Sequence, residues 1–216
     1  MDAWEKTCDT WRLLAAEING SFTESTVPFS ELHSAQVEKQ YKNWTISFQT
    51  TGHTTTGNVS YVPLESFTLN VKRKKFDWTD MLSNAIPPLF MMGSEVTSTG
   101  FAEVEYLYNL TSNDTSKARQ IMNSAKLRDV LVNSDGMQDF LICSMRMGAI
   151  QAGSIFMFDF SKAFDRSMMK ERFEVFQQTL DQLSRLRLAS LESPQVANKF
   201  EKPEDLFDRF NFFKKK

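Results

Sequence analysis

Two short stretches, Trp44-Thr-Ile-Ser-Phe-Gln49 and Phe67-Thr-Leu-Asn-Val-Lys72, decide the fold class. In both of them apolar side chains alternate with polar ones. Successive side chains of a β-strand point to opposite faces, so this alternation predicts strands with one buried face and one solvated face. Half-buried strands of this kind are typical of antiparallel sheets. The sequence thus predicts an antiparallel sheet in this part of the chain.

Further strands are expected on both sides of these two. Residues 50–57 are polar and rich in Thr and Gly, which predicts a long hairpin loop before a strand that begins near Val59 and stops at Pro63. Residues 102–110 alternate again and predict a strand with Glu103 and Glu105 on its polar face. Strands are also expected at 140–147 and 154–160, where the run from Ile155 to Phe158 is apolar on both faces, as in a central strand.

Helices are predicted at both ends of this region and within it. The apolar residues of Ala3–Ile18 recur every three or four positions, and so do Met169, Phe173, Phe176, Leu180 and Leu183 in a long helix expected at about 165–191. Asp77 is a candidate N-cap for a short helix that ends near residue 87. Asn113 or Asp114 would cap a helix that runs through Met122, and residues 126–132 predict another.

These elements predict an α+β fold, in which antiparallel sheet segments are covered by an N-terminal helix and a long C-terminal helix. Residues 1–191 are expected to form the domain, either as one layer or as two sub-layers that meet near residue 93. Residues 192–216 are interpreted as a linker followed by an amphipathic aromatic tail.

Composition narrows the classes of function. The 216 residues carry a formal net charge of −2, which makes a nucleic-acid partner a poor expectation because such binding depends on clustered basic residues. The start of the chain does not resemble a signal peptide, and no stretch has the length of apolar sequence that a transmembrane helix needs. Cys8 and Cys143 lie far apart, so no disulfide framework is indicated and a cytoplasmic location is expected.

The order of these signals resembles a loosely defined group of bacterial α+β domains that have no established activity. The resemblance rests on Trp11–Ile18, Asn43–Ile46, Phe67–Val71, Gly93–Phe101 and the helical stretches at 113–120 and 126–131. Members of the group are often tethered behind transmembrane helices, and an acidic residue is expected where this chain has Ala102. The resemblance therefore implies an architecture and carries no catalytic or binding site to this sequence.

The sequence predicts no catalytic residue, cofactor or metal ligand set. His53 lies in the Thr-rich loop, which cannot easily hold a base rigid, and His33 lies in a segment of weak periodicity, so neither is expected to be a catalytic base. Closely spaced Cys and His pairs that would hold zinc do not occur. Asp159 and Asp165 are interpreted as turn and helix-cap residues. Glu103 and Glu105 would share a strand face and could serve acid–base chemistry if that face were a cleft, although the solvated face of a sheet is the simpler interpretation.

Two features remain as candidates for partner binding. One is the basic run Lys72, Arg73, Lys74 and Lys75, and the other is the apolar stripe of the tail, Leu206, Phe207, Phe210 and Phe213. They favour a non-catalytic interaction or scaffold domain that binds a protein partner, or its own subunit, through a sheet edge or the tail. The alternatives are a peripheral domain that binds an anionic membrane surface or lipid, and an enzyme of unrecognised type.

Overall fold

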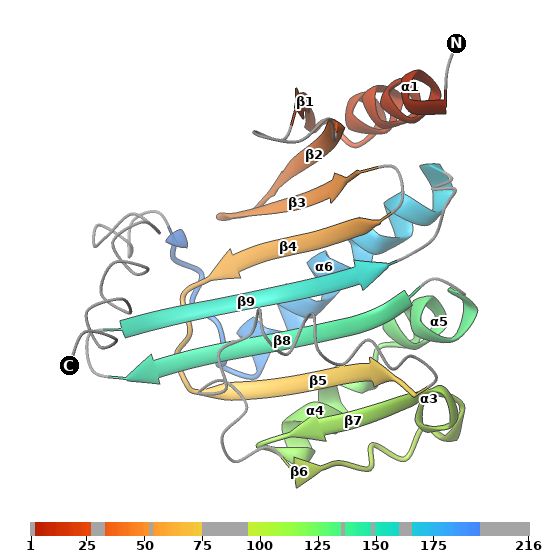
Figure 1. The fold of residues 1–216 in the computed structure, drawn as a ribbon. Helices are drawn as coiled ribbons and strands as arrows, with labels where there is room; N and C mark the ends of the chain where they lie inside the picture. Colours follow the sequence, from red (N-terminus) through yellow and green to blue (C-terminus); the bar gives the residue numbers. More distant parts are fainter. Residues whose placement is uncertain are drawn as a thin grey trace, which may run out of the picture.

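The computed structural model describes residues 3–26, 33–51, 54–74, 95–134, 137–147, 150–159 and 166–194. It is an α+β fold built on a nine-stranded antiparallel sheet, as the sequence predicts. The strand order is β1-β2-β3-β4-β9-β8-β5-β7-β6 (Figure 1). The hairpin of β8 and β9 thus lies between β4 and β5, which are consecutive in the chain.

The strands are β1 (Ser21–Thr26), β2 (His33–Tyr41), β3 (Trp44–Thr50), β4 (Thr55–Tyr61), β5 (Phe67–Arg73), β6 (Glu95–Val96), β7 (Tyr108–Ser112), β8 (Met137–Met147) and β9 (Ile150–Asp159). The helices are α1 (Ala3–Glu17), α3 (Ala102–Leu107), α4 (Thr115–Met122), α5 (Ala125–Asn133) and α6 (Arg166–Arg185). The short helix expected after Asp77 lies outside the described residues.

The strands follow the predicted alternation. In β3, Trp44, Ile46 and Phe48 are fully buried against the helices, while Thr45 and Gln49 are exposed on the opposite side. The prediction that residues 155–158 form a central strand is confirmed, because β9 is the fifth of the nine strands and has β4 and β8 on its two sides. We call the side of the sheet that faces away from the described helices the far face.

The core lies between the sheet and α6, which crosses behind β4, β9 and β8 in Figure 1. All five residues of the predicted apolar stripe are buried, which confirms the helix face. The centre of the Phe48 ring lies 4.7 Å from that of Phe173 and 5.1 Å from that of Phe176. Phe140 contacts Phe176 edge-on. Aromatic pairs at these separations add to the stabilisation that burial gives.

The long helix ends at Arg185, earlier than the predicted boundary near residue 191. Arg187 has a φ of 56°, and the backbone N–H of Leu188 donates to the carbonyl of Leu183 at 2.8 Å. A left-handed residue followed by such a bond closes the last turn of a helix. The chain then passes the end of β4, where Leu64 donates to the carbonyl of Leu188 at 2.9 Å and Ser190 donates to that of Val62 at 2.8 Å.

The predicted strand at 102–110 is wrong in its first part. Residues 102–107 form α3, and only Tyr108 onward is extended. The carboxylate of Glu105 accepts the backbone N–H groups of Thr99 at 2.6 Å and Gly100 at 2.9 Å, and these bonds fix the chain just before the helix. The alternation of apolar and acidic residues at 102–106 therefore does not correspond to two faces of a sheet.

A further correction concerns Asp159, which the sequence suggests as a turn or cap residue. Its carboxylate is 1% exposed and pairs with the guanidinium of Arg172, which is 2% exposed on α6. Ser134 donates to Asp159 at 3.2 Å and accepts from Arg172 at 2.9 Å. Arg172 therefore lies inside the core, where the end of β9 carries a carboxylate for it.

The predicted long loop at 50–57 is shorter in the structure, because Thr55 and Gly57 already belong to β4 and are buried. A Cβ atom at Gly57 would lie 2.4 Å from the ring of Phe48 and 3.0 Å from that of Phe176. Glycine is therefore required here by the close approach of two core rings.

Gly57→Ala is accordingly expected to lower the free energy of unfolding by about 1 to 3 kcal/mol, the usual cost of overpacking a core. Asn58→Ala, at the next and exposed position, should change it by less than about 0.5 kcal/mol. Urea denaturation of the two variants measures the difference. Equal effects would show that the rings move aside without cost.

Candidate partner-binding surfaces

The outer edge of β1 is the first candidate surface. Strand β1 has six residues, and within the described part of the chain it pairs with β2 on one side and with no strand on the other. The opposite edge of the sheet is β6, which has only two residues. A long free edge offers unpaired backbone donors and acceptors, whereas a very short edge strand does not.

The register shows which backbone groups of β1 face outward. Tyr41 and Trp44 close the two-residue turn between β2 and β3, so these two residues exchange backbone hydrogen bonds. The bonded direction alternates along β2, and this places Thr23 in a pair bonded to β2. Phe22 and Glu24 therefore direct their backbone N–H and C=O groups away from the sheet.

A cleft of about 470 Å³ lies beside this edge, between α1 and β1. Its lining residues are Trp4, Glu5, Cys8, Asp9, Arg12 and Glu24. The indole of Trp4 donates to Glu24 at 2.9 Å, and Arg12 donates to Glu24 at 3.1 Å and to Asp9 at 2.8 Å. Arg12 also lies over the ring of Phe22, 5.0 Å from its centre. The cleft is thus amphipathic, with the indole of Trp4 beside a network of charged side chains.

The electrostatics of the cleft do not produce a nucleophile. The hydrogen bond from Trp4, together with the one from Cys8 and the nearby positive charge of Arg12, lowers the pKa of the Glu24 carboxyl. Burial, and then the neighbouring Glu24 carboxylate, raises the pKa of the Cys8 thiol to about 11. Cys8 is therefore protonated at neutral pH, and a thiol in that state is a weak nucleophile. His33 lies nearby, with the centre of its ring 5.7 Å from that of the Trp4 ring.

The far face carries the second candidate surface. On β1 to β4 this face presents Ser, Thr, Gln, Asn and Glu side chains, but on β8 and β9 it becomes apolar. We call these residues the apolar strip: Leu141, Cys143, Met145, Ala152, Phe156 and Phe158. Leu141 and Cys143 are each 6% exposed, and burial raises the pKa of the Cys143 thiol to about 12.

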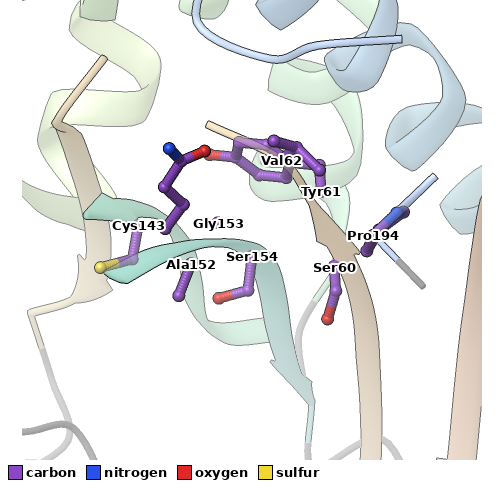
Figure 2. A pocket seen from close by; sticks show the side chains of 9 residues that line it. Ser60, Tyr61, Val62, Cys143, Ala152, Gly153, Ser154 and Pro194 are labelled. Atoms are coloured by element: carbon purple, nitrogen blue, oxygen red, sulfur yellow. The ribbon is translucent and has the colours of Figure 1, made fainter. Parts of the chain in front are cut away.

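A small pocket of about 160 Å³ lies at one end of this strip, bordered by Cys143, Ala152, Ser154 and Pro194. Figure 2 shows Ser154 and Ala152 pointing to one side of the strands and Tyr61 to the other. The Tyr61 hydroxyl and the Ser144 hydroxyl lie 2.5 Å apart in the core. Tyr61 also fills the space above Gly153, where a Cβ atom would lie 2.5 Å from its ring.

The basic run is tied into the fold where the structure describes it. Lys72 lies across from Asp139 on the neighbouring strand. Arg73 donates to the carbonyls of Ser134 at 2.9 Å and Met137 at 3.2 Å, and Lys74 donates to the carbonyl of Glu105 at 2.5 Å. Lys75 lies outside the described residues, and so do Leu206, Phe207, Phe210 and Phe213 of the tail.

The two carboxylates suggested for acid–base chemistry do not act as a pair. Glu103 approaches Arg128 at 3.5 Å, while Glu105 is turned onto the loop that precedes α3. The backbone N–H groups of Gly100 and Thr99 lower the pKa of the Glu105 carboxyl against the opposing effect of burial. Glu105 is thus a capping residue in this structure.

Neither a metal site nor a membrane span is found in the described ranges. No cluster of three or more His, Cys, Asp or Glu side chains there is arranged to hold a metal ion. None of the helices described is both long and apolar enough to cross a membrane. His53 lies outside these ranges.

Comparison with known proteins identifies a shared fold. No protein-family model matches the chain, and no curated protein matches it. Among solved structures it is similar to the crystal structure of the mycobacterial trehalose monomycolate transport factor A, TtfA, with a TM-score of 0.50. The two chains share 10% sequence identity, and the similarity covers 84% of this chain and 96% of that one. At this identity the similarity establishes the fold alone.

Proposed function

We propose that the protein is a non-catalytic interaction domain that binds a protein partner by strand addition at β1. The observation that carries the proposal is the six-residue edge of β1, which pairs with no further strand among the described residues and ends a sheet whose other edge is only two residues long. In strand addition an extended segment of the partner pairs with an exposed sheet edge, and main-chain hydrogen bonds provide much of the affinity. Phe22 and Glu24 supply the outward backbone groups for such pairing.

The sequence of β1 supports this assignment. Proteins usually protect long edges with Lys, Pro or a bulge, and Ser21-Phe-Thr-Glu-Ser-Thr26 has no Lys or Pro. Its one charged side chain, Glu24, is bound by Trp4 and Arg12 and so does not project from the edge as an isolated charge.

The adjacent cleft gives such a partner a source of specificity. Alternate side chains of an added strand point to the same face, so every second one would point towards α1 and the cleft. The aromatic wall of Trp4 and the cation of Arg12 favour an apolar or acidic side chain there.

A non-catalytic role also fits the chemistry of the cleft. General acid–base or nucleophilic catalysis needs an activated group with a partner that orients it. The raised pKa of Cys8 and the lowered pKa of Glu24 leave neither group poised to exchange protons near neutral pH. The cleft is better suited to recognising a side chain than to transforming it.

Charging the edge tests the proposal. The double variant Ser21→Lys/Thr23→Lys places two cations on the exposed side of β1 and should lower partner retention by about tenfold or more, because edge lysines oppose strand pairing. Gln49→Lys, on the same face but two strands inward, is the matched control and should retain the partner. Quantitative mass spectrometry of proteins captured by the three forms from native extract measures retention.

Hydrogen exchange supplies a direct readout in the purified complex. The backbone amides of Phe22 and Glu24 are expected to exchange more slowly when the partner is bound, since strand addition would place them in hydrogen bonds. If a partner binds while the exchange of both amides is unchanged, strand addition at β1 is wrong.

A lipid-associated role is the second candidate, and the shared fold with TtfA, a trehalose monomycolate transport factor, favours it. Co-flotation with vesicles of anionic and neutral phospholipid distinguishes the two candidates. Retention on anionic vesicles that falls with salt would support lipid binding through basic residues such as those at 72–75. If the protein is an interaction domain without this role, it should remain in the fraction that does not float with the vesicles.

A further inference from the structure

The apolar strip on the far face runs along both strands of the β8–β9 hairpin. Leu141 pairs with Phe156 and Met145 with Ala152, while Cys143 pairs with Ser154 and Phe158 with Asp139. From Ala152 to Phe158 it extends for roughly 20 Å, at about 3.3 Å per residue of strand. Leu141 and Cys143 are buried, Met145, Phe156 and Phe158 are partly buried, and Ala152 is exposed. Apolar side chains on the outer face of a sheet generally mark a contact.

The path of the chain after α6 leads to this strip. Helix α6 lies on the covered side of the sheet, but residues 188–191 run past the end of β4, where Ala189 bridges to Pro63 and Asn43 donates to the carbonyl of Leu191 at 2.6 Å. Pro194 then borders the pocket that contains Cys143 and Ala152. The last described residue is therefore placed at the end of the apolar strip.

The rest of the chain has the length and composition to reach the strip. Twenty-two residues follow Pro194, and twelve positions separate it from Leu206. A chain of that length spans up to about 40 Å when extended, so it reaches every part of a 20 Å strip. Residues 203–213 would measure roughly 16 Å as a helix, with Leu206, Phe207, Phe210 and Phe213 on one face.

We propose that residues 195–216 fold back across the end of the sheet and pack the stripe Leu206, Phe207, Phe210 and Phe213 on the apolar strip of β8 and β9. A peptide of this length is a marginal helix in isolation, so its order depends on the surface that receives it. Docking on the same molecule has the advantage that the attachment at Pro194 keeps the tail at a high local concentration. The tail then covers the far face and does not occupy the edge of β1.

The two native cysteines provide the test, because one lies on the strip and the other in the opposite layer. Cys143 faces the tail in this proposal, whereas Cys8 is a buried residue of α1 on the other side of the sheet. Labelling of the full-length protein with N-ethylmaleimide, followed by peptide mass spectrometry, gives a separate rate for each thiol. Phe207→Asp/Phe210→Asp is expected to raise the labelling rate of Cys143 by about tenfold or more, since an exposed thiol ionises and reacts more readily.

Phe212→Asp is the matched control, since position 212 lies off the helical stripe and carries the same chemical change. It should leave the labelling of Cys143 at the wild-type rate. The rate at Cys8 should be equal in all three proteins, which verifies that the domain is folded in each.

Three results would overturn the proposal. Unchanged labelling of Cys143 in Phe207→Asp/Phe210→Asp would assign its burial to another segment, such as residues 75–94. Protection that disappears when the wild-type protein is diluted would assign the strip to the tail of a second copy. Equal acceleration by Phe212→Asp would show that charge in the tail matters and its apolar stripe does not.

Discussion

Asp159→Ala is expected to lower the free energy of unfolding by about 3 to 5 kcal/mol, which is typical of removing one partner from a buried ion pair. The substitution leaves the guanidinium of Arg172 in a site where its side chain is 2% exposed. Ser134 also loses its acceptor, although it can still accept from Arg172. The cost arises mainly because a buried guanidinium that has lost its carboxylate is poorly stabilised in a protein core.

The control for this prediction removes both charges. Asp159→Leu/Arg172→Met replaces the pair with apolar side chains and should recover most of the lost stability, since buried ion pairs are often close to neutral relative to apolar substitutes. Urea denaturation of the wild type, the single variant and the double variant gives the three values. A double variant as unstable as Asp159→Ala would show that the pair specifies the packing of α6 on β9.

Phe176→Ala is the second large effect, with an expected loss of about 3 to 5 kcal/mol. Phe176 is fully buried and contacts the rings of Phe48 and Phe140 from the middle of α6. Truncation at this position would open a cavity between the helix and the central strands, and the sheet cannot collapse into it without breaking its pairing.

Glu171→Ala, on the exposed side of the same helix, is the comparison and should change stability by less than about 0.5 kcal/mol. Thermal or urea melts of the two variants decide the matter. Comparable losses from both would mean that α6 contributes through its helical propensity, and that the packing of its apolar face adds little.

The parts of the fold that were predicted from sequence have a strong local period. Residues 44–49 and 67–72 alternate cleanly and form β3 and β5, and the apolar stripe that begins at Met169 forms the buried face of α6. In these segments one face of the element is buried and the other is solvated, so apolar and polar side chains alternate with the period of the element.

Elements whose structure depends on distant or tertiary contacts were not predictable in this way. Residues 102–106 alternate like a strand but form a helix, because Glu105 binds the backbone just before it. Strand β1 was missed because Phe22 is its only apolar residue, so the strand has little hydrophobic period. Its role as a sheet edge follows from the strand order, which no local pattern contains.

The burial of Arg172 is a structural feature that sequence reasoning could have found. It lies three residues after Met169 and four before Phe176, so helical spacing places it on the apolar face. A charged residue at such a position requires a buried partner, and Asp159 is the nearest carboxylate on the preceding strand. The partner-binding candidates in the tail remain predictions, which the labelling of Cys143 tests.

The insertion of the β8–β9 hairpin between β4 and β5 has a consequence for the order in which the molecule assembles. As the chain emerges during synthesis, β4 and β5 are complete some sixty residues before the hairpin that joins them, at a typical rate of about 5 to 20 residues per second. For several seconds both strands keep an unpaired edge flanked by apolar side chains. Contacts that span so much sequence also form slowly, since a long loop must close first. We expect this nascent intermediate to be the stage most prone to aggregation, because unpaired strand edges and exposed apolar side chains favour contacts between chains.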